Sequence, residues 1–362
     1  MNKIFTSPLS TLLIFGIFLI LNSCSNTANE TSEEEVQKTV YASDVIPFFD
    51  HWKLILGDGS NAGFANNFEH KDFFYTANDG ESDWVVYKAP NAGDTHGTSN
   101  NTRTELAQAK KWYPATANDK LTATLKVMNV SATGDARVAA SYAVVIGQIH
   151  SADGHENEPL KIFYKKFPGH TKGSIFWHYE INTAGDDNSG RWDYSTAVWG
   201  YDFSVVGTEE NTYPEEPKDG IALGEELSYE IEVKDGIMSL TFTSEGHETK
   251  TFTKNLVVSE YTTTADIPAQ TQGLFVPIGQ DGVERENAYT GEGLFFKLGC
   301  YNQTNGKSPE VNRNWCSGAE THGGDVQKQY EDGNYAEVWF KTASISVSDA
   351  AVSNEGYFTK ND

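Results

Sequence analysis

Short segments of alternating polar and apolar residues recur along most of this chain, and they restrict the fold to one built from β-strands. Residues 120–130 place apolar side chains at every second position, so these side chains share one face of a strand. Residues 227–233 and 237–242 flank Lys234-Asp235-Gly236, which predicts a β-hairpin. The other segments expected to be strands are residues 137–150, 174–181, 249–258, 291–303 and 335–347.

Helical periodicity is scarce, and the composition supports the same fold class. The chain has 17 Tyr, 20 Phe, 8 Trp and 32 Gly residues, which suits short strands joined by turns better than a helical bundle. Regularly spaced strands separated by turns are typical of a β-sandwich. We therefore expect an all-β jelly-roll β-sandwich, formed by one domain at residues 41–362.

The N-terminus has the pattern of a lipoprotein signal peptide. Lys3 supplies a positive charge, and the apolar stretch from Leu12 to Leu21 is too short for a typical transmembrane span. The stretch ends in Leu21-Asn22-Ser23-Cys24, which resembles a bacterial lipobox. Residues 1–23 are then the signal peptide and Cys24 is lipidated. The alternative is an ordinary signal peptide followed by an incidental cysteine.

Residues 24–40 are polar and acidic and contain no aromatic side chain, which predicts a disordered tether. We expect an exported monomer at the outer membrane or cell surface that touches the membrane only through its lipid. Export places the chain in an oxidising compartment. Cys300 and Cys316 then either form a disulfide or remain two buried thiols, and both alternatives are open.

The charge of the chain limits its partners. The formal net charge is −24, from 51 acidic and 27 basic residues, which argues against a nucleic acid as partner. A polyanionic substrate requires a local cluster of Lys and Arg, which salt screening over about 8–10 Å permits. The chain contains no CxxC pair and no His-x-x-x-His pair, so no metal site and no cofactor are predicted.

Two short segments each place reactive side chains on one strand face. Arg103 and Glu105 share a face in the first segment. Gln148 and His150 share a face in the second, with Ile149 pointing to the core. Each has an ordinary explanation when taken alone, such as a surface ion pair or a structural histidine.

A third segment, residues 296–303, places Lys297, Gly299, Tyr301 and Gln303 on one face. Gly299 is expected to let a ligand approach the backbone closely. Together the three segments supply an imidazole, a phenol, an amide, a guanidinium and an ammonium group. That set of groups indicates a catalytic site.

These segments resemble, in order, the three signature blocks of polysaccharide lyase family 7, the alginate lyases. The matching residues are Arg103-Thr104-Glu105-Leu106, Gln148-Ile149-His150 and Phe296-Lys297-Leu298-Gly299-Cys300-Tyr301-Asn302-Gln303. The first block ends in Ala107, where the family usually has a second arginine, so a subsite is expected to differ. The resemblance implies a jelly-roll fold with a substrate groove on a concave sheet and a metal-independent mechanism.

The resemblance also implies cleavage of alginate or oligoalginate by β-elimination. The proton on C5 is weakly acidic because it lies beside a carboxylate, which must first be neutralised. Arg103 and Gln148 are suited to bind that carboxylate and stabilise the enolate-like transition state. His150 is the candidate base. Tyr301, with a reference pKa of about 10, is the candidate acid for the leaving O4, or both base and acid for mannuronate.

Three further residues are assigned to substrate binding. Glu105 is expected to orient Arg103, Lys297 to support the charge of the groove or Tyr301, and Gln303 to line the groove. The Ile149 variant of the second block is associated in the family with guluronate-containing substrates.

Alternatives to an alginate lyase are a carbohydrate-binding module, a glycoside hydrolase and a lyase of another uronan such as glucuronan. A binding module needs neither a base nor an acid. A hydrolase needs two carboxylates flanking the bond, and the matched blocks offer only Glu105. The same elimination chemistry serves any 4-linked uronate, so the last alternative stays open.

Three long polar stretches, residues 57–102, 185–225 and 304–334, are expected to be functional loops. Loops that fold over a groove close one of its ends, which favours release of short products from a chain end. We therefore expect exolytic action. Aromatic residues in these stretches are expected either to stack on sugars or to pack within the loops: Trp84, Trp192, Tyr194, Trp199, Tyr201 and Trp315.

Overall fold

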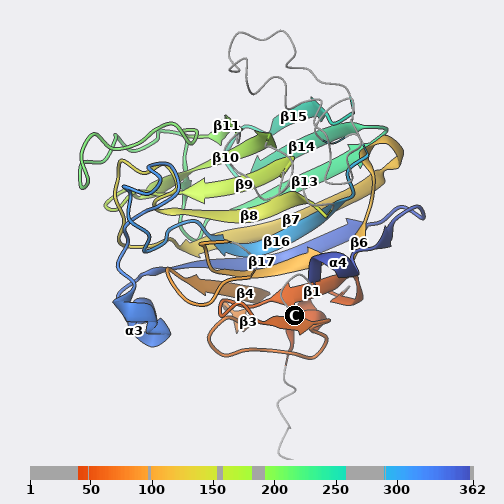
Figure 1. Cartoon of the computed structure of the whole chain (residues 1–362), viewed down its shortest axis with the longest axis horizontal. Coiled ribbons are helices and arrows are strands. Elements are labelled where there is room, and N and C mark those ends of the chain that lie inside the picture. Colours follow the sequence, from red (N-terminus) through yellow and green to blue (C-terminus); the bar gives the residue numbers. More distant parts are fainter. Residues whose placement is uncertain are drawn as a thin grey trace, which may run out of the picture. The chain divides into compact units, whose positions relative to one another are not determined.

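The structure is a computed structural model that describes residues 40–47, 49–96, 99–152, 158–181, 192–257, 289 and 291–358. The expected signal peptide, Cys24 and the tether up to residue 39 lie outside the described residues. The rest is built from two antiparallel β-sheets that pack face to face (Figure 1). None of the helices in the described ranges has the length and apolarity needed to span a bilayer.

The first layer, called the front sheet, has the strand order β11-β10-β9-β8-β16-β5-β1-β2, with β12 beside β10. Its strands are β1 (Trp52–Ile55), β2 (Asn61–Gly63), β5 (Arg103–Gln108), β8 (Ala143–Ser151), β9 (Leu160–Lys165), β10 (Lys172–Ile181), β11 (Trp192–Trp199), β12 (Ile221–Ala222) and β16 (Leu294–Asn302).

The second layer, called the back sheet, has the order β15-β14-β13-β7-β17-β4-β3. Its strands are β3 (Phe74–Asn78), β4 (Asp83–Pro90), β7 (Asn118–Asn129), β13 (Glu226–Lys234), β14 (Ile237–Ser244), β15 (Lys250–Asn255) and β17 (Tyr335–Ser346). The other elements are short: α1 (Ala42–Val45), η1 (Phe49–His51), β6 (Lys110–Lys111), η2 (Pro114–Thr116), η5 (His322–Gly324), α3 (Val326–Glu331), β18 (Val352–Ser353) and α4 (Glu355–Phe358).

The main hydrophobic core lies between the two sheets and accounts for the alternation in the sequence. Leu121 and Leu125 of β7 meet Leu106 of β5 and Phe296 of β16 in this core, and all four are fully buried. Burying one such side chain stabilises the fold by about 1.5–3 kcal/mol. The expected all-β jelly-roll sandwich is confirmed, as is the hairpin of β13 and β14.

The structure differs from the expectation in three segments. The strand expected at residues 137–150 begins only at Ala143, because the chain turns before it and Tyr142 has φ 62°. The expected loop 57–102 contains β3 and β4, and Trp84 of β4 is buried. Most residues of β4 are buried on both faces, so the strand lacks the alternation on which the expectation depended. The expected loop 185–225 contains β11 and β12, and Trp199 of β11 is buried.

Cys300 and Cys316 are separate buried thiols, which is one of the two alternatives left open by the sequence. Cys300 belongs to the core between the sheets. Cys316 lies in the loop between β16 and α3. The two side chains are therefore parts of different surroundings, and no disulfide joins them.

Candidate active site

β5, β8 and β16 are neighbours in the front sheet, and they carry the three segments singled out from the sequence. Tyr301 of β16 lies opposite Arg103 of β5, and Lys297 of β16 lies opposite Gln148 of β8. His150 is the next outward residue of β8 after Gln148. The sheet therefore brings all five side chains together on its outer face, the face turned away from the back sheet.

A β-bulge in β8 sets the direction of two of these side chains. The pairing of β8 with β9 shifts register between Val145 and Gly147, so the strand accommodates one extra residue there. Val145 packs in a cluster on the outer face, whereas Ile149 belongs to the core between the sheets. Strict alternation from Val145 would turn Gln148 and His150 into the core, and the bulge turns them outward.

Glu105 is the centre of a buried polar network. Its Oε2 lies 2.5 Å from Nζ of Lys297 and 3.7 Å from Nη1 of Arg103. Its Oε1 accepts a hydrogen bond from Nε2 of Gln148. The expected contact between Glu105 and Arg103 is confirmed. Glu105 and Lys297 are fully buried, so their expected role in direct substrate binding is revised to one of supporting Arg103 and Gln148.

Arg103 and Gln148 retain unused hydrogen-bonding capacity. Cζ of Arg103 lies 3.7 Å from the ring centroid of Tyr301, a cation–π contact. Among the described residues, the buried Nε of Arg103 and the buried Oε1 of Gln148 have no hydrogen-bond partner, and Nε2 of Gln148 carries a second N–H. Buried polar groups are nearly always paired, so these atoms suit a substrate that brings a carboxylate and hydroxyl groups.

His150 is held as a neutral imidazole. Its Nδ1 donates a hydrogen bond to the carbonyl oxygen of Ser151 at 2.7 Å, so Nε2 carries the lone pair. Nε2 faces Glu158, 3.5 Å from Oε1. Burial lowers the pKa of His150 to about 3, which keeps the ring neutral at physiological pH. A neutral imidazole with its lone pair on Nε2 is the form that a general base requires.

Tyr301 is the most exposed of the candidate catalytic side chains. Its hydroxyl lies 3.0 Å from Oγ of Ser99, a residue that sequence reasoning did not single out. Gln303 is buried and donates from Nε2 to the carbonyl oxygen of Tyr301 at 3.3 Å. The contact of Gln303 with substrate stays a prediction.

The backbone around Gly299 leaves no room for a side chain. Gly299 has φ 144°, and a Cβ at this position would lie 2.5 Å from the carbonyl oxygen of Thr104 and 2.8 Å from Cα of Glu105. The glycine is therefore required by the close approach of β5. Close approach of a ligand at Gly299 stays a prediction.

The sequence reading missed two residues beside the base. Glu158 faces His150 and also lies 2.7 Å from Nζ of Lys161. It lies just before β9, which begins at Leu160. Tyr357 has its ring centroid 5.6 Å from that of His150, and no motif surrounds it.

Comparison with known proteins decides the class of this site. The family described as alginate lyase matches residues 46–347, which is most of the chain and contains all three segments. The chain belongs to the alginate lyase family. It is therefore a polysaccharide lyase, and the hydrolase and the non-catalytic binding module are set aside.

Individual relatives agree with the family. An alginate lyase of Klebsiella pneumoniae is 26% identical over 302 residues, which cover 72% of this chain and 83% of that protein. The crystal structure of an exolytic family 7 alginate lyase from Zobellia galactanivorans is 63% identical, with a TM-score of 0.78, and covers 86% of this chain and 99% of that chain. The Klebsiella pneumoniae structure is 20% identical with a TM-score of 0.57, over 83% of this chain and 96% of that one, and shows the same fold.

The outer face of this alginate lyase therefore offers what an elimination needs: donors for a carboxylate, a neutral imidazole and a phenol. In the part of the chain that the structure describes, no three His, Cys, Asp or Glu side chains are grouped so that they could hold a metal ion. The positive charge of the site comes from Arg103 and Lys297, which lie on either side of Glu105.

Proposed function

We propose that this alginate lyase acts exolytically, removing short unsaturated products from the end of guluronate-containing chains. The observation that carries the proposal is a cluster of three packed loops that covers the front sheet beside Tyr301. The 63% identity to an enzyme described as exolytic supports it. The Ile149 variant of the second block supports the preference for guluronate. A preference for glucuronan is the remaining alternative.

The roles of the side chains follow from their positions. Arg103 and Gln148 bind the carboxylate next to C5, which stabilises the charge that develops there. Nε2 of His150 takes the C5 proton, and the electron pair of the C5–H bond forms the C4–C5 double bond. The C4–O4 bond breaks as Tyr301 donates its proton to O4. Exchange with solvent then returns the proton from His150 to Tyr301.

The covering cluster begins on β8, the strand next to β16, where Val145 lies opposite Tyr301. Phe163 of β9 and Phe176 of β10 stack on the outer face with ring centroids 4.9 Å apart. Phe203 and Trp315 come from two different loops and lie 4.9 Å from each other. Both loops pack in this cluster, together with residues 138–140 of a third loop. A polymer cannot cross the sheet where these side chains fill its outer face.

The three loops are tied to each other and to the sheet. Nζ of Lys165 on β9 donates to the carbonyl oxygens of Ala139 at 2.8 Å and Val205 at 3.3 Å. The backbone N–H of Ala140 donates to the carbonyl oxygen of Asn314 at 3.0 Å. These bonds fix the loops in the closed arrangement, which supports a pocket with one blocked end.

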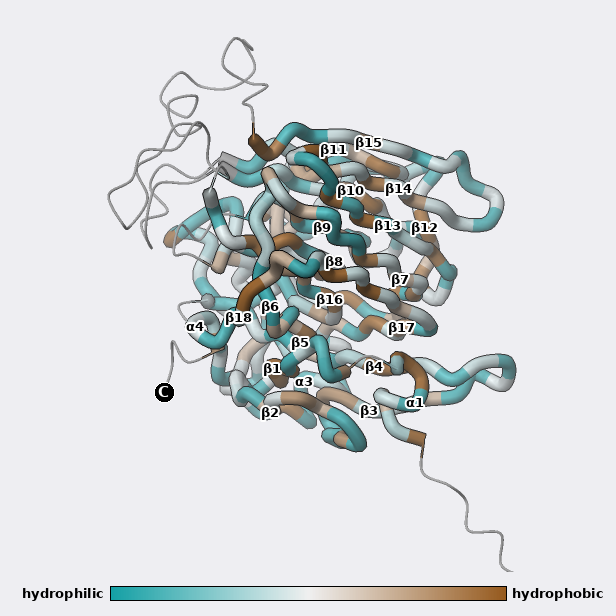
Figure 2. Tube along the Cα trace, turned by 90° about the vertical axis from the view of Figure 1, so that its right-hand side faces the viewer, coloured by the Kyte–Doolittle hydropathy of each residue, from teal (hydrophilic) through white to brown (hydrophobic). Residues whose placement is uncertain are grey.

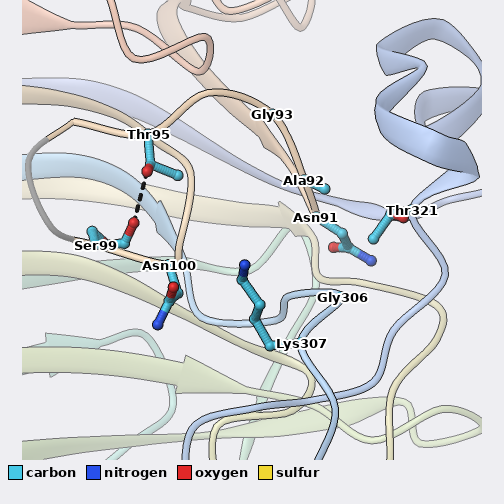
Figure 3. A pocket seen from close by; sticks show the side chains of 9 residues that line it. All are labelled: Asn91, Ala92, Gly93, Thr95, Ser99, Asn100, Gly306, Lys307 and Thr321. Carbon is cyan, nitrogen blue, oxygen red and sulfur yellow. Dashed lines mark hydrogen bonds between the residues drawn. The ribbon is translucent and has the colours of Figure 1, made fainter.

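A cavity of about 280 Å³ is lined by Asn91, Ala92, Gly93, Thr95, Ser99, Asn100, Gly306, Lys307 and Thr321 (Figure 3). Its volume is just below the usual range for ligand pockets, about 300–1,000 Å³, and suits a short ligand. Ser99 lines the cavity and contacts the hydroxyl of Tyr301. Lys307 supplies a positive charge for a carboxylate. We assign this cavity to the sugar on the leaving-group side of the broken bond.

The proposal extends to location and assembly. Cys24 at the end of the apolar stretch and the acidic residues that follow it support an exported lipoprotein at the outer membrane or cell surface, and the protein acts there as a monomer. Labelling with a radioactive fatty acid tests this. A Cys24→Ala variant should lose the label and leave the membrane fraction.

Sizing the products over time tests exolytic action on polyguluronate, polymannuronate and alternating alginate. The shortest unsaturated products should dominate from the first time points, fastest with guluronate-containing chains. A Phe203→Ala, Trp315→Ala double variant should open the blocked end and yield longer products, whereas Trp339→Ala on the back sheet should not. Early release of long oligosaccharides by the unaltered protein would contradict the proposal.

A further inference from the structure

A C-terminal strap, residues 348–358, crosses from the back sheet to the outer face of the front sheet. It leaves the end of β17, and its strand β18 pairs with β6 through Val352 and Lys111. Figure 2 shows β18, β6 and α4 on the outer side of the front sheet. The strap lies beyond the residues that match the family, which end at residue 347.

Several contacts fix the strap in place. Nδ2 of Asn354 donates to the carbonyl oxygen of Gln108 at 3.2 Å. Nζ of Lys53 on β1 donates to both oxygens of Glu355, at 2.8 and 2.7 Å. The same Nζ lies 4.7 Å from the ring centroid of Phe358. These contacts hold α4 on the sheet although the helix has only four residues.

The strap places the ring of Tyr357 against the catalytic base. The centroid of this ring lies 5.6 Å from that of His150 and 4.7 Å from that of Phe295, and Phe295 lies 5.3 Å from His150. The imidazole therefore touches two aromatic rings, and Nδ1 is bonded to the carbonyl oxygen of Ser151. His96 packs on Tyr357 at 5.7 Å. Tyr357 and His150 are both more than nine-tenths buried.

Ala107 explains why the ring fits there. Ala107, Phe295, Tyr357 and Phe358 form one buried cluster. The corresponding block of the alginate lyases usually ends in arginine, and an arginine on the same backbone would compete with the Tyr357 ring for space. In this chain, the small side chain of Ala107 and the ring of Tyr357 occur together in that cluster. The departure from the family motif and the strap are therefore parts of one arrangement.

We propose that Tyr357 is a positioning residue for the elimination: with Phe295, it holds the His150 imidazole so that Nε2 faces the sugar and water is kept away. The proposal rests on His150 acting as the base. Tyr357 neither gives nor takes a proton in the reaction. Its contribution is to fix the ring that does, and a misplacement of about 1 Å at such a ring costs about 100-fold in rate.

The charges around His150 predict a change in the pH profile. Burial is the main reason that the pKa of His150 falls to about 3, Glu158 opposes this shift, and Lys297 and Arg103 add to it. Removing the Tyr357 ring admits water and leaves these three charged groups in place. The pKa of His150 then rises toward its ordinary value of about 6.5. Below that pH, His150 is protonated and cannot accept the C5 proton.

Steady-state kinetics of the purified protein over about pH 5–9, a range centred near the ordinary pKa of histidine, test the proposal. Tyr357→Phe should keep kcat within about 2-fold, because the ring remains, whereas Tyr357→Leu should lower kcat about 10- to 100-fold with little change in KM. The acid limb of the pH profile of kcat should move up toward about pH 6.5 in Tyr357→Leu alone. The control is Phe358→Leu, which alters the same strap without touching His150 and should show neither effect.

Imidazole ¹⁵N NMR of His150 gives a readout that does not depend on turnover. At a pH just below the ordinary histidine pKa, the ring should be neutral with the proton on Nδ1 in the unaltered protein and in Tyr357→Phe, and protonated in Tyr357→Leu. A neutral ring and an unchanged acid limb in a folded Tyr357→Leu variant would overturn the proposal. A raised KM at unchanged kcat would also overturn it, because Tyr357 would then bind substrate. Full activity of His150→Asn would show instead that the base is misassigned.

Discussion

Nε2 of His150 lies 3.5 Å from Oε1 of Glu158, and the other oxygen of this carboxylate lies 2.7 Å from Nζ of Lys161. In the resting site, Nε2 carries a lone pair and donates no hydrogen bond to the carboxylate. When Nε2 takes the C5 proton, an imidazolium forms beside a fixed negative charge in a buried site. Glu158 therefore stabilises the cation that the reaction creates.

Removing the negative charge of Glu158 should slow the chemical step. Glu158→Gln keeps the size of the side chain and removes its charge, so kcat should fall about 10-fold or more while KM changes little. Steady-state kinetics on polyguluronate measure both constants. A variant with unaltered kcat would show that Glu158 serves only to anchor Lys161.

The buried network at Glu105 should dominate the stability of the site. Glu105→Gln leaves Lys297 buried beside a neutral side chain, and breaking a buried ion pair in this way costs about 3–5 kcal/mol. Urea unfolding measures the loss. Lys120→Met is the control, because its partly exposed pair with Glu230 at 3.0 Å contributes about 0–1 kcal/mol. Equal losses in the two variants would contradict the central position of Glu105.

Stability should depend on pH through His150. Its pKa falls to about 3 in the folded protein because of burial, whereas the unfolded value is about 6.5. The unfolded chain binds the proton first, so the contribution of the neutral ring is complete above about pH 6.5 and is lost as the pH falls toward 3. Between pH 6.5 and 5 the loss amounts to about 2 kcal/mol.

Urea unfolding at these two pH values, repeated with His150→Gln, isolates this contribution. The unaltered protein should lose more stability on acidification than the variant, by about the amount given above. Parallel losses in the two proteins would mean that His150 titrates normally in the folded state.

The two cysteines should react as thiols only after unfolding. Burial raises the pKa of both Cys300 and Cys316, and a thiol that stays protonated is a poor nucleophile. Alkylation without reductant, followed by peptide mapping, should label both residues in urea and neither in the native protein. A disulfide-linked pair of peptides would contradict the structure.

Several parts of the site follow from sequence patterns alone. The alternation in Gln148-Ile149-His150 predicted which side chains share a face, and Arg103 and Glu105 were correctly paired. Order along the chain cannot show that a bulge near Gly147 turns Gln148 and His150 outward. It also cannot show that Glu105 contacts Lys297, which lies almost two hundred residues away in the sequence.

Burial on two faces and long-range packing explain the other failures. Trp84 reads as a loop residue because β4 is paired on both sides and buried on both faces, which removes the period of two. Tyr357 lies in a terminal segment without a motif, and it reaches the site only because the strap folds back onto β5 and β1. Contacts of this kind depend on the completed sheet.

Ultraviolet absorbance of the C4–C5 double bond tests the central claim most directly, measured with alginate and the purified protein, His150→Asn and Tyr301→Phe. The account predicts that absorbance rises from the first moments with the unaltered protein. Both variants should slow this rise by at least about 100-fold, because general acid and base catalysis contribute about 10²–10⁴ each. Full activity in either variant would contradict the assigned base and acid, and no rise with any alginate would contradict the elimination itself.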